Sequence, residues 1–247
     1  FELLGNPQIT TPTGPYGLDL LDYNWLSYII STKKPGLIIH LAAKAIVART
    51  FTEPRETFEN NVMGAVNLFE AARLCLHIAT ARAGNVIGGG DWSEKRLIPD
   101  IVRAAAKGEK TIVHTPTSTR PWQFVLEPFS GYLMLGQAIL EGRDVNGAWN
   151  FGPDGEAMSV LDILKTAKIY WPKIDWEVDD TPTHPKMVYL LKIDNTKAKK
   201  ELGWRPALTM KAAVKNTIEW YRSYYEHGII STESDIIDYQ FRMRDKK

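Results

Sequence analysis

The sequence predicts an α/β protein with a doubly wound parallel sheet and a smaller, mainly helical lobe. Residues 37–41 form a short apolar run, LIIHL, as expected of a parallel strand that is covered on both faces. Apolar residues then recur at helical spacing over residues 62–72, with Asn61 placed as the N-cap. Residues 35–74 are therefore expected to form a strand, a loop and a helix, the βα unit from which such a sheet is built.

The remaining elements follow from the same patterns. Helices are expected at residues 18–30, 98–106, 128–140, 159–171, 195–202 and 209–227. Strands are expected at residues 111–114 and 148–151. Ser159 is placed as a helix cap with Asp162 three residues later, and Gly203 and Gly228 are placed as helix stops. Residues 229–247 are polar, and we interpret them as a tail or a partner-contacting arm.

Composition excludes several classes of function. The 247 residues, 44% of them hydrophobic, are enough for one large α/β domain or two lobes. Thirty basic and 29 acidic side chains create no field that would gather nucleic acid or a lipid surface. A single cysteine excludes an internal disulfide, and the five histidines show no zinc-site spacing, so no metal is expected. No apolar run reaches membrane-spanning length and the first residues do not resemble a signal peptide, so we expect a cytoplasmic protein.

Residues 82–92, RAGNVIGGGDW, are the most informative segment. A strand end runs into the polar Asn85 and then into three glycines, where backbone can approach a ligand without interference from a Cβ atom. By itself, a glycine triplet is more often an ordinary surface loop. Two further blocks change this balance: residues 96–100, RLIPD, open a helix, and residues 120–128, RPWQFVLEP, follow a short span later.

Together these blocks resemble the nucleotide-sugar branch of the extended short-chain dehydrogenases/reductases, the NAD-dependent epimerase/dehydratase family, and within it most closely the CDP-glucose 4,6-dehydratases. The resemblance covers most of residues 17–225 and is strongest at residues 82–128. It implies a Rossmann-like fold with bound NAD. The NAD-binding lobe would comprise residues 1–92 and 112–147, and the substrate-binding lobe residues 93–111 and 148–247.

The activity that the resemblance implies is that of a hydro-lyase. CDP-glucose would be converted to CDP-4-keto-6-deoxyglucose by NAD-mediated oxidation at C4, loss of water and return of the hydride to C6. In this family the reaction belongs to lipopolysaccharide O-antigen and dideoxysugar biosynthesis. Family members commonly pair through two long helices per subunit, so a homodimer is expected, and a tetramer stays open. Neither nucleic acid nor membrane is an expected partner.

Two segments are candidates for NAD binding. By resemblance, Asp19 and Leu20 flank the adenine; the residues facing the ribose and phosphates are Leu41, Ala42, Ala43 and Lys44. Two alanines at the carboxyl end of a buried strand leave room for a cofactor, although a strand that merely turns into a loop would look similar. As an alternative, an Asp here could cap the next helix, and Asp22 fits that position better than Asp19. Asn61 matches a family position credited with tying adjacent strands together, so we interpret it as structural.

A nucleotide sugar carries a diphosphate, whose binding calls for backbone N–H groups, amides and an arginine fork. By resemblance, Asn85, Arg96 and Arg120 hold the diphosphate and nearby groups, while Leu97 and Pro99 line the base and ribose. As isolated residues, the two arginines would more often be surface charges. Asn150 is a weaker candidate, because a turn-capping Asn explains it equally well.

The redox residues of the family are missing from the sequence. No glycine-rich phosphate-binding turn precedes residue 35, no Thr-Asp-Lys block is present, and none of the ten tyrosines has a lysine four residues later. In the family, the strand and helix that carry these groups lie between the regions matching Leu76 and His77. A natural deletion there would leave buried strand edges unpaired, so we hypothesise missing segments at this junction and before residue 1. The catalytic residues stay unassigned, and a nucleotide-sugar 4-epimerase or an inactive nucleotide-sugar binding protein remain alternatives.

Overall fold

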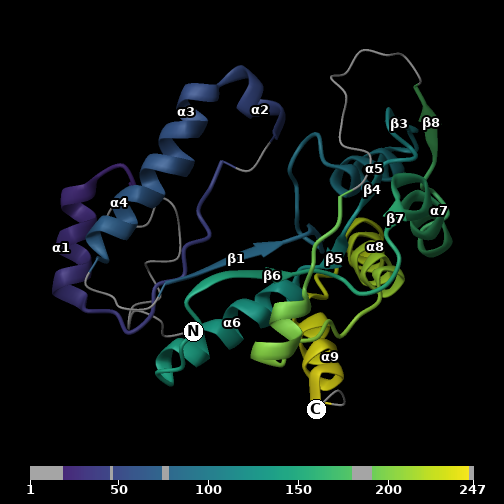
Figure 1. Cartoon of the computed structure of the whole chain (residues 1–247). Coiled ribbons are helices and arrows are strands. Elements are labelled where there is room, and N and C mark those ends of the chain that lie inside the picture. Colours follow the sequence, from purple (N-terminus) through teal and green to yellow (C-terminus); the bar gives the residue numbers. More distant parts are fainter. Residues whose placement is uncertain (1–18, 45–46, 74–77, 180–190, 245–247) are drawn as a thin grey trace. The chain divides into compact units, whose positions relative to one another are not determined.

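The computed structural model describes residues 19–44, 47–73, 78–179 and 191–244 (Figure 1). Its helices are α1 (Tyr23–Lys33), α2 (Val47–Thr52), α3 (Pro54–Phe58), the π-helical turn η2 (Glu59–Met63), α4 (Gly64–Ala71), α5 (Leu97–Lys107), α6 (Leu126–Leu140), α7 (Val160–Tyr170), the π-helical turn η3 (Ala198–Leu202), α8 (Met210–His227) and α9 (Thr232–Arg244). Its strands are β1 (Ala79–Ala83), β2 (Asn85–Ile87), β3 (Thr111–Val113), β4 (Thr119–Arg120), β5 (Trp122–Phe124), β6 (Gly147–Phe151), β7 (Met158–Ser159) and β8 (Trp176–Val178).

The chain forms two compact units. The first consists of residues 1–78 and 136–146, and the second of residues 79–135 and 147–247. Every strand of the described residues belongs to the second unit, and the described part of the first is helices and loops. None of the described helices is both long and apolar enough to cross a membrane, and the described residues contain no cluster of His, Cys, Asp and Glu that could hold a metal ion.

The expected strand at residues 37–41 is absent, and this prediction was wrong. The segment is irregular, Ile38 and Ile39 are exposed, and Leu41 is 57% exposed. A strand forms only when it can make hydrogen bonds to a neighbouring strand, and the described part of the first unit contains no other strand. The proposed junction between Leu76 and His77 lies outside the described residues. The expected N-cap at Asn61 was also wrong, because Asn61 lies inside a continuous helical run from α3 to α4.

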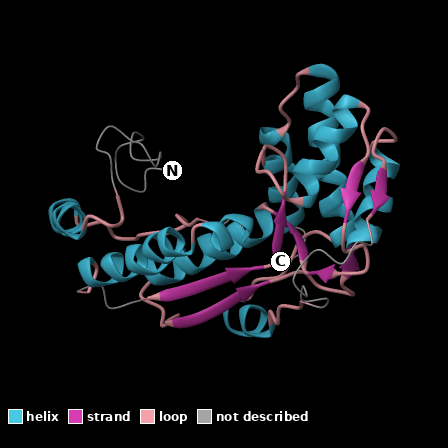
Figure 2. Ribbon diagram, turned by 90° about the horizontal axis from the view of Figure 1, so that it is seen from above, coloured by secondary structure: helices cyan, strands magenta, loops and turns pink. Residues whose placement is uncertain are grey.

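The second unit is organised by strand pairs between distant segments (Figure 2). β1 pairs with β6, β2 with β5 and β3 with β8, all in parallel, and β4 pairs with β7 antiparallel. The strands expected at residues 111–114 and 148–151 are confirmed as β3 and β6. Parallel neighbours far apart in sequence are the hallmark of crossover topology, in which helices cover the sheet.

The helices of this unit begin and end where local signals predicted. Ser159 and Asp162 form a reciprocal capping box at the start of α7. Gly203 and Gly228 end η3 and α8 in the left-handed conformation, with φ of 74° and 68°. A core cluster lies between α5, α7 and α8, and its largest fully buried aromatic side chains are Trp171, Tyr221 and Phe124. Trp149, Phe151 and Trp204 are also fully buried but lie outside this cluster, and Phe151 packs against Tyr132 of α6 and against Trp204.

The C-terminal segment is not the polar tail that composition suggested, because residues 232–244 form α9. Tyr239 of α9 is only 6% exposed, and its hydroxyl donates to Glu127 at 2.8 Å. Glu127, 1% exposed, also accepts the backbone N–H groups of Ala207 and Leu208, at 3.0 and 2.6 Å. Burial, together with the Glu127 carboxylate, raises the pKa of the Tyr239 phenol, so the hydroxyl stays protonated and keeps donating. One buried carboxylate thus joins α6, the loop before α8 and α9.

This network predicts graded losses of stability. Tyr239→Phe removes one hydrogen bond to a charged acceptor and should lower the free energy of unfolding by about 2 kcal/mol. Glu127→Ala should cost more, because it leaves two buried N–H donors without an acceptor. Urea unfolding measures both, with Glu156→Gln in an exposed loop as the control. An unchanged midpoint for Tyr239→Phe would contradict the role of this hydroxyl.

Asp235 on α9 predicts a pH-dependent contribution. Burial, with Asp238 and Glu219 nearby, raises its pKa from 3.8 to about 6. A raised carboxyl pKa favours the protonated folded state, so this contribution to stability is present at acidic pH and is lost as pH rises from 3.8 to about 6. Asp235→Asn should therefore raise the melting temperature at pH 7 and leave it nearly unchanged at acidic pH. Glu156→Gln, in an exposed loop, is the control, and an equal gain at both pH values would refute the assignment.

Candidate functional site

The candidate cofactor residues in the first unit are held on one helical run. The Asn61 side chain accepts from the backbone N–H of Lys44 at 2.7 Å and donates to its carbonyl at 3.1 Å. Asn67 donates to the carbonyl of Leu20 at 3.0 Å. A Cβ atom at Gly64 would lie 3.0 Å from the Cβ of Leu20. Residues 61, 64 and 67 share one helix face, so this face places both predicted NAD segments. Asn61 has the structural position expected of it.

The first of these segments is a tight turn ahead of α1. The Asp19 carboxylate accepts from the N–H of Leu21 at 2.9 Å, which shapes the turn around Leu20. Asp22, in contrast, accepts from the N–H of Trp25 at 2.9 Å and is the N-cap of α1. The interpretation of Asp22 rather than Asp19 as the cap is confirmed. Asp19 is exposed beside Leu20.

The second segment offers an open apolar strip. Leu41, Ala42 and Ala43 are exposed, and Lys44 forms an ion pair with Glu56 in α3. An apolar strip without bulk at two positions, close to a helix that also holds Asp19 and Leu20, suits a flat adenosine moiety. These residues have the chemistry that would suit the adenine half of NAD. For the pyrophosphate half, no glycine-rich phosphate-binding turn precedes residue 35 in the sequence.

The glycine run has a different role from the one that its pattern suggested. A Cβ atom at Gly88 would lie 2.7 Å from the Val125 side chain, and one at Gly89 would lie 2.1 Å from the Trp220 ring. Gly90 has φ of +80°, which side chains rarely adopt. At these positions the backbone approaches protein side chains, so the expectation that the glycines face a ligand is corrected.

The loop that follows the glycines is fixed by α5 and α8. The Tyr221 hydroxyl donates to the carbonyl of Asp91 at 2.6 Å. Arg103 donates to the carbonyls of Trp92 and Ser93 at 3.0 and 3.2 Å, and it forms an ion pair with Asp100. Burial raises the pKa of Asp100, while Arg103 lowers it. Sequence reasoning missed Arg103; its position two helical turns after Arg96 was the available signal.

Two of the predicted substrate residues flank Pro121. Asn85 begins β2, and its N–H donates to the carbonyl of Pro121 at 2.9 Å. Arg120 immediately precedes Pro121 in β4, and its guanidinium donates to the carbonyl of Thr119 at 2.8 Å. Both side chains are half-buried. A Cβ atom at Gly84 would lie 2.1 Å from the Pro121 carbonyl oxygen, so glycine is required for this approach.

The other predicted substrate residues occupy separate positions. Arg96 is the N-cap residue of α5, with its guanidinium 3.6 Å from the Asp91 carboxylate. Leu97 is half-buried in the first turn of α5, whereas Pro99 is buried and packed inside the protein. Asn150 in β6 donates to the carbonyl of Asp194 at 3.1 Å, which is a structural tie.

Pro121 also borders a small cavity of about 70 Å³. Its lining residues are Pro121, Pro153, Gly155, Ala157, Leu191, Lys192, Ile193 and Met210. Ligand pockets usually measure roughly 300–1,000 Å³, so this cavity accommodates only part of a nucleotide sugar. It adjoins the segment that carries Asn85 and Arg120, and the backbone after β6 forms its other side.

Comparisons with known proteins agree with these features. Residues 10–86 match the model of the GDP-mannose 4,6 dehydratase family. The chain is 29% identical to CDP-glucose 4,6-dehydratase from Salmonella typhimurium over 290 residues, covering 90% of this chain and 80% of that protein. It is 22% identical to dTDP-glucose 4,6-dehydratase from Neisseria meningitidis serogroup B, covering 83% and 77%.

The fold is similar to that of UDP-glucose-4-epimerase from Stenotrophomonas maltophila, solved with bound NAD and formylated UDP-arabinopyranose. The TM-score is 0.74 at 17% identity, with 85% of this chain and 83% of that chain covered. This likeness confirms the Rossmann-like fold class. Sequence relatives and fold point the same way: the chain is similar in sequence to nucleotide-sugar 4,6-dehydratases and in fold to an NAD-bound nucleotide-sugar epimerase.

Proposed function

We propose that this protein is a hydro-lyase that converts CDP-glucose to CDP-4-keto-6-deoxyglucose with NAD as its cofactor. The observation that carries the proposal is the similarity to a CDP-glucose 4,6-dehydratase over 90% of the chain, at higher identity than to a dTDP-glucose dehydratase over a comparable span. The epimerase from Stenotrophomonas maltophila, a structural neighbour, is only 17% identical and therefore informs on the fold alone.

The substrate diphosphate would bind between Arg120, Asn85 and the start of α5. Arg120 and Asn85 flank Pro121 and provide a guanidinium fork and an amide. The first N–H groups of α5, next to Arg96, are the usual donors for an anion at a helix N-terminus. Leu97 is half-buried beside them, where it can contact the base or ribose. Pro99 and Asn150 would support this site from inside the fold.

NAD would lie along Asp19, Leu20 and residues 41–44 with its adenine half, and when bound it supplies the acceptor and donor of the hydride. A ketone at C4 is what makes the C5 proton of the sugar acidic enough to remove, so oxidation has to precede loss of water. We assign residues 1–92 and 112–147 to the cofactor lobe and residues 93–111 and 148–247 to the substrate lobe.

Oxidation also needs a base near the C4 hydroxyl. Burial raises the pKa of four described tyrosines, Tyr132, Tyr221, Tyr225 and Tyr239. A raised phenol pKa is the opposite of what a base acting near neutral pH requires. We therefore assign no catalytic residue to these tyrosines. The base and the elimination residues would belong to a strand and helix between Leu76 and His77.

Two further observations support such a segment. The alignment with the Salmonella dehydratase spans 290 positions but uses only 90% of a 247-residue chain, so several tens of positions of that relative have no counterpart here. The apolar residues at 37–41 are exposed, as expected of a strand whose neighbour is missing.

An exposed apolar stripe along α3, η2 and α4 supports pairing into a homodimer. The stripe consists of Phe58, Val62, Val66 and Phe69.

The test of this function is product formation from CDP-glucose and NAD, measured as the absorbance of a 4-keto-6-deoxy sugar in base. A polypeptide that carries the additional strand and helix should form this product and have an intact mass above 27.9 kDa. The 247-residue chain alone should bind CDP-glucose without turnover. CDP-galactose as the product would identify an epimerase instead. A mass near 27.9 kDa for the natural protein, with binding and no product, would identify a binding protein.

The substrate residues are tested by binding. Arg120→Met should weaken CDP-glucose binding about tenfold, which is the loss of roughly 1.4 kcal/mol of charge-assisted hydrogen bonding. Arg120→Lys should recover only part of this, because an ammonium lacks the planar fork. Isothermal titration calorimetry measures both, with Arg205→Met as the exposed control in the same unit. Equal dissociation constants for Arg120→Met and Arg205→Met would exclude Arg120 from the site.

A further inference from the structure

Helix α9 has two contrasting faces. Its inner face carries Tyr239, which is 6% exposed, and Met243, which packs against the core. Successive residues of a helix are rotated by about 100°, so positions 237 and 241 lie opposite Tyr239. Ile237 is 48% exposed and Phe241 59% exposed. The helix is therefore anchored on one side and presents two large apolar side chains on the other.

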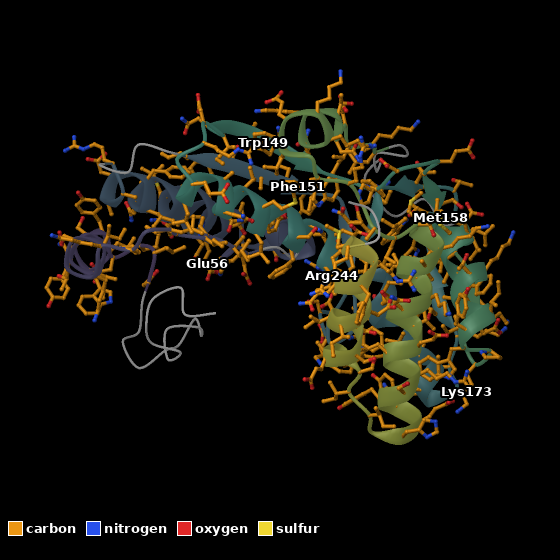
Figure 3. The ribbon with its side chains drawn as sticks, turned by 90° about the horizontal axis from the view of Figure 1, so that it is seen from below. Glu56, Trp149, Phe151, Met158, Lys173 and Arg244 are labelled. Atoms are coloured by element: carbon orange, nitrogen blue, oxygen red, sulfur yellow. The ribbon has the colours of Figure 1, made fainter. Side chains whose placement is uncertain are left out.

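Charges at the two ends of this outer face are opposite in sign. Glu233 lies in the first turn and Arg244 at the last position of α9, and both are exposed. By the same rotation, both side chains fall on the face of Ile237 and Phe241. Arg244, labelled in Figure 3, lies over the Phe241 ring at 5.9 Å from its centroid. On the flank of the helix, Asp238 and Arg242 pair with each other.

The spacing of these four residues is symmetric. Glu233 and Arg244 are about 16 Å apart along the axis, and Ile237 and Phe241 about 6 Å apart, at 1.5 Å per residue. The midpoints of the two pairs fall within one residue of each other, next to position 239. A two-fold axis through that point would superpose apolar on apolar and acid on base at once.

We propose that the outer face of α9, formed by Glu233, Ile237, Phe241 and Arg244, pairs antiparallel with the same face of a second copy of this chain. Ile237 of each copy meets Phe241 of the other, and Glu233 of each meets Arg244 of the other. This arrangement is isologous and closes on itself as a dimer contact. A parallel pairing would place Glu233 against Glu233 and Arg244 against Arg244, which disfavours it.

The area of the contact limits how tightly the two copies should bind. A standard stable interface buries about 800 Å² per partner, and a pair of short helices buries less. Pairing through α9 alone should therefore depend on protein concentration and weaken with added salt. It is independent of the proposed reaction, because none of the four residues belongs to the candidate site, and independent of the apolar stripe on α4.

The test exchanges the charges at positions 233 and 244 and measures self-association by sedimentation velocity over a range of protein concentrations. Glu233→Lys or Arg244→Glu alone places like charges together twice in the dimer and should weaken association about tenfold or more. The double variant restores opposite charges and should return association to within about threefold of the original. Ile237→Asp should abolish this contact, whereas Ile169→Asp, at a 72% exposed position of α7, should leave it intact.

Each other outcome overturns the proposal. A chain that stays monomeric at all concentrations has no such contact. An oligomer that ignores Ile237→Asp assembles through another surface, and Phe69→Asp would identify α4 as that surface. A double variant as weak as the single ones would show that the charges do not meet across the axis. The variants leave the inner face with Tyr239 unchanged, so they should keep the fold. Urea unfolding checks that each variant does so.

Discussion

The close packing of the Trp220 ring against the backbone of Gly89 is the constraint on which the candidate substrate region depends. The indole lies so close that a Cβ atom at this position would be 2.1 Å from the ring. The same ring stacks on Tyr224 and packs edge-on against Tyr221. Because α8 thereby packs onto the loop between β2 and α5, contacts within the protein fix the segment that leads from the strand of Asn85 to Arg96.

Local signals predicted the helices of this chain well. The capping box of Ser159 and Asp162 and the left-handed Gly203 and Gly228 are satisfied by groups a few residues away, so sequence alone is sufficient. Helix α9 was missed because its average composition is polar. Tyr239 and Met243 pack it against the core, and the acceptor for Tyr239 lies 112 residues away at Glu127.

The segments that form the candidate site were predictable from the sequence, but the burial and the contacts of their individual residues were not. The motifs at residues 82–92 and 120–128 predicted that the two blocks act together, and the pairing of β2 with β5 shows them as neighbours. They could not reveal that Pro99 is buried or that Asn150 is engaged with Asp194, because burial is decided by segments distant in sequence. The glycines illustrate the same limit: the sequence shows where a side chain is excluded, and only packing shows that Trp220 excludes it.

One missing element would account for two independent gaps. The first is structural: residues 37–41 have the composition of a buried strand, yet they are irregular and exposed. The second is chemical: the tyrosines with shifted pKa values are all shifted upward by burial, away from the role of a base. In a doubly wound sheet a strand and its crossover helix come as a unit, so an added strand that pairs with residues 37–41 also brings a helix to the carboxyl edge of the sheet. The segment that we propose between Leu76 and His77 would therefore account both for the exposed strand sequence and for the unassigned base.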